Sequence, residues 1–160
     1  LGHIKPFDFE VEYKPANDIN KFICGTPPII AYKAIESGLE IFKDLSIIEI
    51  REKSIKLSEM FIQLMQQECT EFGFMLFSPK NSEQRGSQIS FLHENAYSII
   101  QALISHGIIG DYREPNVMRF GISPLYMRFE DVWNAITCLR EIMQTGEWQS
   151  EKFKNKNYVT

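Results

Sequence analysis

Two short segments of the sequence carry side chains suited to binding an anion. The first is Gly25-Thr26-Pro27-Pro28, which stands where a helix is predicted to begin. Unpaired N–H groups at a helix start suit a phosphate, a threonine hydroxyl adds a donor, and a glycine permits close approach. An ordinary helix cap, with Thr26 as the N-cap residue, also explains the segment. On these four residues alone the cap is the favoured interpretation.

Arg119 is the second candidate, because it lies inside the apolar stretch Val117–Gly121. A buried guanidinium without a partner is costly, and its planar fork matches a carboxylate through two parallel hydrogen bonds. A structural pair with an Asp or Glu, or an edge-strand position facing solvent, is the favoured alternative on this stretch alone. Arg113 lies among opposite charges near a turn, so we expect a structural ion pair there.

No complete catalytic set can be assembled from local spacing. The histidines and cysteines are scattered, at His3, His93, His106, Cys24, Cys69 and Cys138, without a CxxC pair or ligand spacing. Neither a disulfide framework nor a metal site is therefore predicted. None of the eleven lysines follows an apolar strand in the manner of a desolvated Schiff-base amine.

Composition excludes several classes of partner. The net charge is −4, from 21 acidic and 17 basic residues, which argues against nucleic acid as the main partner. No apolar run approaches the ~20 residues that cross a bilayer. Odd, widely separated cysteines favour a reduced, cytoplasmic protein. The basic tail at Lys152, Lys154 and Lys156 is predicted to be a frayed, solvated terminus.

The apolar spacing predicts alternating blocks of helices and strands. A helix is expected from Thr26 to about Phe42, and a second from Ser46, where Ser46 and Glu49 match a capping box. The remaining expected elements are strands at 74–77, 88–92, 108–112 and 117–122, and helices at 96–104 and 129–143, with Gly107 and Gly146 as helix stops. This order predicts an α+β layer with helices on one face of a sheet.

Taken together, these segments resemble kynureninase, a pyridoxal-phosphate (PLP) enzyme, from Leu1 to Trp148. The matching pieces are Leu1–Phe9 (LGH…PFDF), Phe22–Pro28 (FICGTPP), Leu39–Phe42 (LEIF), Arg51–Ser54 (REKS), Gly110–Tyr126 (GDYREPNVMRFGISPLY) and Phe129–Met143 (FEDVWNAITCLREIM). Each piece is short, and their shared order and spacing give the match its strength. The resemblance favours the functional interpretation of both candidate sites.

The resemblance implies a fold-type-I PLP enzyme, of the α/β superfamily, that works as a homodimer. It would hydrolyse L-kynurenine or 3-hydroxykynurenine to L-alanine and anthranilate or 3-hydroxyanthranilate, in tryptophan catabolism and NAD biosynthesis. Residues 1–45 would be the end of the PLP-binding large domain with an interface helix. Residues 46–160 would be the small C-terminal domain, an antiparallel sheet with helices on one face. Thr26, with Gly25, inherits a contact to the phosphate of the neighbouring subunit's cofactor, and Arg119 inherits the substrate α-carboxylate.

The family's remaining site residues match nothing in this sequence. Its Schiff-base lysine, its aspartate at the pyridine nitrogen and most of its phosphate contacts precede the region that resembles Leu1 onward. We therefore expect a carboxy-terminal fragment that contains no catalytic residue, holds no PLP and is inactive alone. Two alternatives stay open: a cysteine desulfurase-like PLP enzyme, and a non-catalytic interaction domain.

Overall fold

The computed structural model describes residues 2–8 and 10–155, in two compact units, Leu1–Leu45 and Ser46–Thr160. We call these the N-terminal and C-terminal units and describe each by itself. Leu1 and Phe9 of the LGH…PFDF motif, and Lys156 of the basic tail, lie outside the described residues. No helix in the described part of the chain is both long and apolar enough to cross a membrane.

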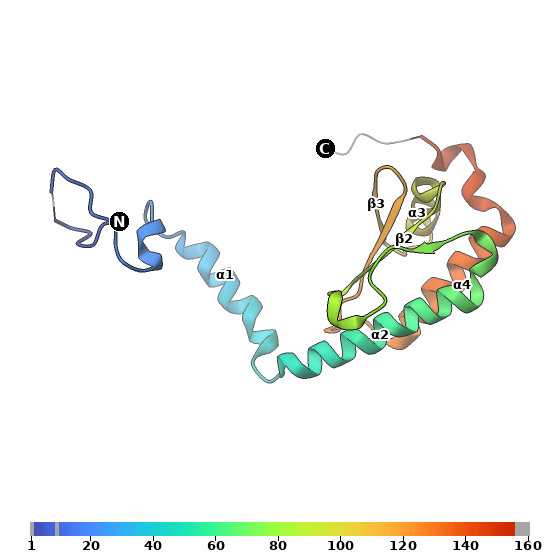
Figure 1. Cartoon of the computed structure of the whole chain (residues 1–160), viewed down its shortest axis with the longest axis horizontal. Helices are drawn as coiled ribbons and strands as arrows, with labels where there is room; N and C mark the ends of the chain where they lie inside the picture. Colours follow the sequence, from blue (N-terminus) through green and yellow to red (C-terminus); the bar gives the residue numbers. More distant parts are fainter. Residues whose placement is uncertain (1, 9, 156–160) are drawn as a thin grey trace. The chain divides into compact units, whose positions relative to one another are not determined.

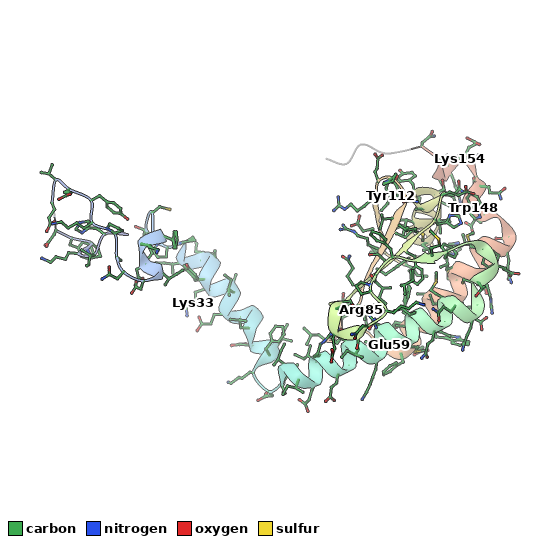
Figure 2. All side chains as sticks on the ribbon, in the orientation of Figure 1. Lys33, Glu59, Arg85, Tyr112, Trp148 and Lys154 are labelled. Carbon is green, nitrogen blue, oxygen red and sulfur yellow. The ribbon has the colours of Figure 1, made fainter. Side chains whose placement is uncertain are left out.

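The N-terminal unit contains one α-helix, α1 (Ile29–Leu39), between two short 3-10 helices, Ile19–Phe22 and Glu40–Phe42. Its first residues fold back on themselves, because His3 and Pro15 form an isolated antiparallel bridge. No residue of α1 is buried, and Ile30 is 88% exposed. The side chains of α1 therefore project without a covering layer in this unit (Figure 2).

Helix α1 begins at Ile29, three residues beyond the predicted N-cap. The expectation that Thr26 caps this helix is wrong, because the N-cap position is Pro28 and no side chain caps the first turn. A proline disfavours the α conformation of the residue before it, so Thr26 and Pro27 both stay outside the helix. Pro28 is the N-cap residue, with a non-helical ψ of 88°, which leaves Thr26 in the preceding loop.

The C-terminal unit is an antiparallel sheet covered by helices. Its strands are β1 (Met75–Leu76), β2 (Gln88–Leu92), β3 (Asp111–Arg113) and β4 (Val117–Gly121), in the order β1-β2-β4-β3. Its helices are α2 (Ile47–Glu68), α3 (Ala96–Ser105) and α4 (Phe129–Thr145), and α2 lies beside α4 (Figure 1). The predicted α+β class with an antiparallel sheet is confirmed.

One hydrophobic core joins the three helices to the sheet. Alternate residues of β2 and β4 enter it, and the register places Ile89 opposite Phe120 and Phe91 opposite Met118. The ring of Phe61, from α2, lies with its centroid 5.0 Å from that of Phe120 and 6.2 Å from that of Phe91. Each fully buried side chain of this size contributes roughly 1.5–3 kcal/mol, so these contacts hold the sheet against α2.

Most predicted boundaries agree with the structure. The capping box is present, because Ile48 N–H donates to Ser46 Oγ and Ser46 N–H donates to Glu49 Oε2, both at 3.2 Å. The strand expected at 108–112 forms only at Asp111–Arg113. The reason is that Ile108 N–H donates to Leu103 O at 3.0 Å, so its backbone closes the end of α3 and does not join the sheet.

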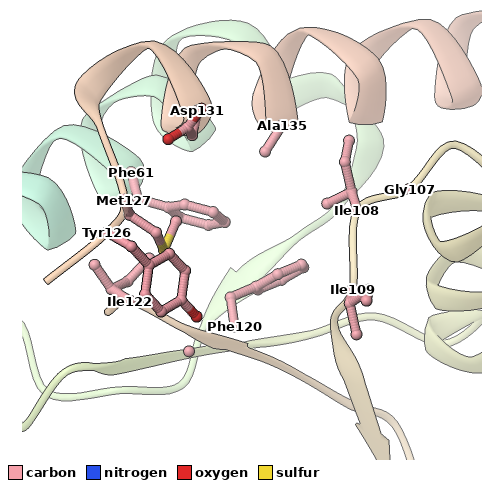
Figure 3. Close-up of a pocket in the computed structure, with 11 residues that line it drawn as sticks. Phe61, Gly107, Ile108, Ile109, Phe120, Ile122, Tyr126, Met127, Asp131 and Ala135 are labelled. Carbon is pink, nitrogen blue, oxygen red and sulfur yellow. The ribbon is translucent and has the colours of Figure 1, made fainter. Parts of the chain in front are cut away.

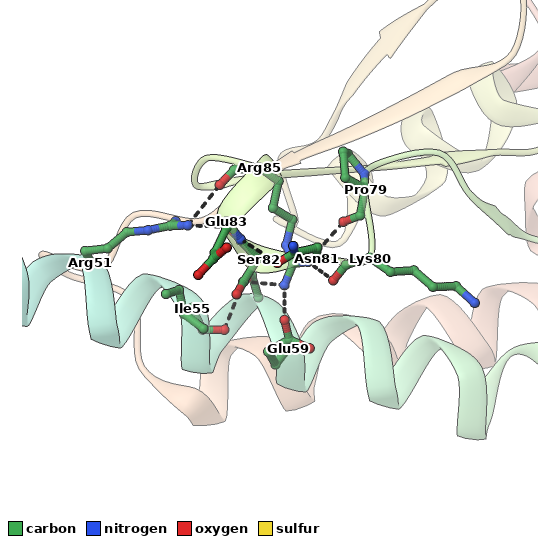
Figure 4. A network of polar contacts seen from close by, with 10 residues as sticks. Arg51, Ile55, Glu59, Pro79, Lys80, Asn81, Ser82, Glu83 and Arg85 are labelled. Carbon is green, nitrogen blue, oxygen red and sulfur yellow. Dashed lines mark hydrogen bonds and ion pairs between the residues drawn. The ribbon is translucent and has the colours of Figure 1, made fainter.

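Arg85 fastens the loop between β1 and β2 to α2. Its side chain is only 2% exposed, and its Nη1 donates to the carbonyls of Pro79 (3.0 Å) and Lys80 (2.6 Å). Its Nη2 donates to Ser58 Oγ at 3.3 Å and to Glu59, both on α2 (Figure 4). The buried guanidinium thus donates hydrogen bonds to loop carbonyls and to side chains of α2, which holds this polar loop in one conformation.

Replacing Arg85 by Met should lower the free energy of unfolding by about 2–3 kcal/mol, because loop carbonyls lose their donors and Glu59 loses its ion pair. The matched control is Lys56→Met, at an exposed position of α2, which should leave the free energy of unfolding unchanged. Denaturant titration of both variants measures the difference. Equal free energies for the two variants would contradict the structural role of Arg85.

His93 joins the 3-10 helix Thr70–Phe72, which follows α2, to the start of α3 as a neutral ring. Its Nδ1 accepts from Asn95 N–H at 3.0 Å, so the proton lies on Nε2, which donates to Phe72 O at 3.0 Å. The residue is 8% exposed, with the Phe74 ring centroid 4.8 Å away. Burial holds the pKa of His93 below its usual 6.5. Protonation of Nδ1 would remove the bond from Asn95.

This shift predicts a pH dependence of stability. Below pH 6.5 the unfolded chain protonates His93 more readily than the folded chain does, so the free energy of unfolding falls as the pH drops from 6.5. Above pH 6.5 the neutral His93 makes its full contribution to the free energy of unfolding. In His93→Gln this part of the slope should disappear from unfolding curves measured at several pH values between about 5 and 7. A slope that survives the substitution unchanged would show that another group causes it.

Candidate functional site

Arg119 lies in the second of the two inner strands of the sheet, between two core residues. Met118 is 0% exposed and Phe120 is 6% exposed, and both face the helices. Because side chains alternate along a strand, Arg119 points to the opposite face of β4. Its side chain is 29% exposed, and its register partners are Ser90 in β2 and Asp111 in β3.

Asp111 is the partner of both nearby arginines. Its Oδ2 accepts from Arg119 Nη2 and lies 3.4 Å from Arg113 Nε. The structural pairs expected for Arg113, and considered as the alternative for Arg119, are therefore both present. Two guanidinium groups contact the same carboxylate oxygen.

Arg119 keeps donors for a further anion. Within the described residues its Nη1 has no hydrogen-bond partner, and its Nε is buried without one. The same face carries apolar side chains: Met75 and Phe77 are each 61% exposed, and Val117 is half-buried. A guanidinium with an unpartnered Nη1 beside apolar surface can hold a carboxylate whose remaining part is apolar.

Gly25 and Thr26 lie in the loop before α1, in the N-terminal unit, so they are described separately from Arg119. Both are exposed, and the Thr26 hydroxyl makes no hydrogen bond to the described residues. A Cβ at Gly25 would meet nothing within 4 Å, so the backbone is open on that side. The first turn of α1 offers free N–H groups at Ile29 and Ile30. A phosphate would find these donors unused.

A cavity of about 390 Å³ lies on the helix side of the sheet, between β4 and α4 (Figure 3). Phe120 lines it, so it is on the face of β4 opposite to Arg119. Its one carboxylate, Asp131, accepts from Arg128 Nη2 at 2.8 Å and from Arg128 N–H at 2.7 Å. The side-chain bond from Arg128 holds the pKa of Asp131 below its usual value. The carboxylate of this cavity is therefore already engaged by Arg128.

The other reactive side chains are poorly placed for catalysis. Within the described residues no group of three His, Cys, Asp or Glu could hold a metal ion. Burial raises the pKa of Cys69 to about 11 and also raises that of Cys138, which makes both thiols poor nucleophiles. This disfavours a cysteine-based reaction at either position. None of the ten described lysines is buried.

Sequence reasoning missed Asp111 as the partner of Arg119. The two residues are eight positions apart, and only the β3–β4 register places them opposite each other. The available signal was the alternation of charged residues at Asp111 and Arg113 before a proline turn, which is typical of a strand entering a hairpin.

The comparisons with known proteins agree on one family. The family model for the kynureninase C-terminal domain matches residues 50–139. The kynureninase of Pseudomonas fluorescens is 42% identical over 160 residues, which is 100% of this chain and 38% of that protein. The kynureninases of Burkholderia mallei (strain SAVP1) and Burkholderia pseudomallei (strain K96243) are each 42% identical over 159 residues, 99% of this chain and 38% of theirs. The chain thus spans 38% of the length of these curated relatives.

Proposed function

Because the chain belongs to the kynureninase family, we propose that it supplies two anion-binding elements to a hydrolase that cleaves L-kynurenine or 3-hydroxykynurenine. The products are L-alanine and anthranilate or its hydroxylated form, in tryptophan catabolism. The observation that carries the proposal is Arg119, an arginine in the middle of β4 whose Nη2 is held by Asp111 and whose Nη1 has no partner among the described residues. In this proposal Arg119 binds the α-carboxylate of the substrate.

The residues before α1 fit the phosphate of pyridoxal 5'-phosphate. The free hydroxyl of Thr26, the open backbone at Gly25 and the unpaired N–H groups of the first turn are donors that the described residues do not use. When bound, the cofactor supplies the electron withdrawal that the carbon–carbon cleavage needs. The contribution of this chain is to bind and orient: Thr26 takes part in holding the phosphate, and Arg119 fixes the amino-acid end of the substrate.

We further propose that the protein works as a homodimer in the cytoplasm. We place residues 1–45 at the end of the large domain and residues 46–160 in the small domain of a homodimer. The uncovered apolar side chains of α1, such as Ile30 at 88% exposure, support burial of this helix in that assembly. The three cysteines are free, as is typical of the reducing cytoplasm.

Arg119→Ala in the full-length enzyme should lower kcat/KM for kynurenine, because the substrate carboxylate loses a charged partner. The expected loss of transition-state stabilisation is about 2–5 kcal/mol. Steady-state kinetics measures the loss. Arg113→Ala is the matched control and should keep a near-normal kcat/KM. The Arg113 side chain is 62% exposed and is joined to Asp111 by a contact of 3.4 Å. The free energy of unfolding of the Arg119 variant should fall by only about 1 kcal/mol, because the ion pair between Arg119 and Asp111 is partly exposed. A near-normal kcat/KM would contradict the assigned role.

Thr26→Val should weaken cofactor binding by about 1.5–3 kcal/mol, because one hydrogen bond to a charged phosphate is lost while the side-chain volume is kept. Titration of the apoenzyme with pyridoxal 5'-phosphate, followed by absorbance, gives the Kd. Thr137→Val, a half-buried position in α4, serves as the control and should keep the wild-type Kd. An unchanged Kd in the Thr26 variant would remove this residue from the phosphate site.

The 160-residue chain alone should not turn over kynurenine when the cofactor is added. The support is that each of the ten described lysines is exposed or half-buried, so none has the desolvated environment that lowers the pKa of a nucleophilic amine. The fluorescence of released anthranilate measures turnover, with the full-length enzyme as the positive control. Release of anthranilate above the background of cofactor and substrate would contradict this expectation.

A further inference from the structure

Three charged side chains lie side by side on the face of the sheet that points away from the helices. Asp111 and Arg119 are direct register partners across β3 and β4, and Arg113 follows two residues after Asp111 on the same face. The Oδ2 atom of Asp111 accepts from Arg119 Nη2 and lies 3.4 Å from Arg113 Nε. The pair of Asp111 and Arg119 is therefore set by the backbone register and does not depend on a mobile loop.

We propose that Asp111 is a positioning residue for Arg119, an inference that rests on the proposed role of Arg119 in binding the substrate carboxylate. Asp111 holds one end of the guanidinium through Nη2. The Nη1 group, which has no partner among the described residues, stays available for the carboxylate. Asp111 touches neither substrate nor cofactor in this account and acts only through Arg119.

A held guanidinium is a better carboxylate site than a free one. Arginine has a long side chain with many rotamers, and binding an anion through a free arginine costs the entropy of ordering it. The bond to Asp111 orders the guanidinium before the substrate arrives. The buried Nε shows that the side chain is also packed along its length, while 29% exposure keeps its end accessible.

The position of Asp111 is itself constrained by the glycine before it. Gly110 is buried, and a Cβ at this position would lie 2.7 Å from Ile100 Cδ1 and 3.1 Å from Phe120 Cε1. A residue with a Cβ at this position would force the side chains of Ile100 and Phe120 to shift, so glycine fits this close approach to α3 and β4 best. This close approach brings the first residue of β3, Asp111, opposite Arg119.

Charge and positioning predict opposite effects when Asp111 is removed. Without its carboxylate, the face keeps two guanidinium groups and gains net positive charge, so electrostatics alone would strengthen the binding of an anion. If Asp111 positions Arg119, the same change weakens binding, because the guanidinium is no longer ordered. The sign of the change therefore separates the two explanations.

The test uses the full-length enzyme with its cofactor and measures Kd by calorimetry for two kynurenine analogues. Both analogues resist hydrolysis, and one of them lacks the α-carboxylate. For Asp111→Ala we expect the Kd of the carboxylate-bearing analogue to rise about tenfold, from the cost of ordering Arg119 on binding. The Kd of the other analogue should not change. Asp111→Glu should restore much of the affinity, and the control Arg113→Gln should stay within about threefold of wild type because its charge is exposed and screened.

Arg119→Ala, measured alongside, separates failure of this inference from failure of the proposed function. If Arg119→Ala loses the preference for the carboxylate-bearing analogue while Asp111→Ala keeps or increases it, the positioning role is wrong and the role of Arg119 stands. If neither variant alters that preference, the role of Arg119 is itself wrong. A loss in Asp111→Ala that Asp111→Glu reverses supports the positioning role.

Discussion

The alternation of side chains along β4 is the constraint on which both the core and the candidate site depend. Met118 and Phe120 are buried against the helices, so Arg119 between them must face the other way. A slip of one residue in the pairing of β2 with β4 would bury the guanidinium and expose two large apolar side chains. The hydrophobic core therefore fixes the face on which the charged row lies.

The helices contribute by holding this sheet in place. Phe61 of α2 packs against both inner strands, and Arg85 ties the loop between β1 and β2 to the same helix through Ser58 and Glu59. The C-terminal segment adds to this layer, because Phe153 is 6% exposed and Tyr97 donates to Asn155 O at 2.9 Å. The tail, predicted to be frayed, is thus packed on α3 as far as the structure describes it. A rigid sheet suits a residue that must meet a small ligand in one geometry.

Local signals in the sequence predicted what depends on neighbours along the chain. The capping box at Ser46 and Glu49 and the glycine stop at Gly146 are examples, because each needs only a few consecutive residues. The predicted start of α1 at Thr26 was wrong because Pro27 and Pro28 keep the residues before them out of the helical conformation. The partner of Arg119 and the burial of Arg85 depend on contacts between distant segments, and a charged residue in a polar loop gives no local sign of being buried.

The kynureninase resemblance predicted roles for Thr26 and Arg119 that the residues alone did not favour. The structure adds the physical conditions for those roles: a loop with unused donors in one unit, and an arginine with a fixed partner and a free nitrogen in the other. These conditions agree with anion binding at both places. They also show why the ion pair of Arg119 and a ligand role do not exclude each other, since Asp111 occupies only one nitrogen of the guanidinium.

The role of Arg119 can be tested by a crystal structure of the full-length enzyme with a hydrolysis-resistant kynurenine analogue. We expect the α-carboxylate of the analogue to accept hydrogen bonds from Arg119 while Asp111 still holds the same guanidinium. A carboxylate bound to another residue, with Arg119 paired only to Asp111, would contradict it.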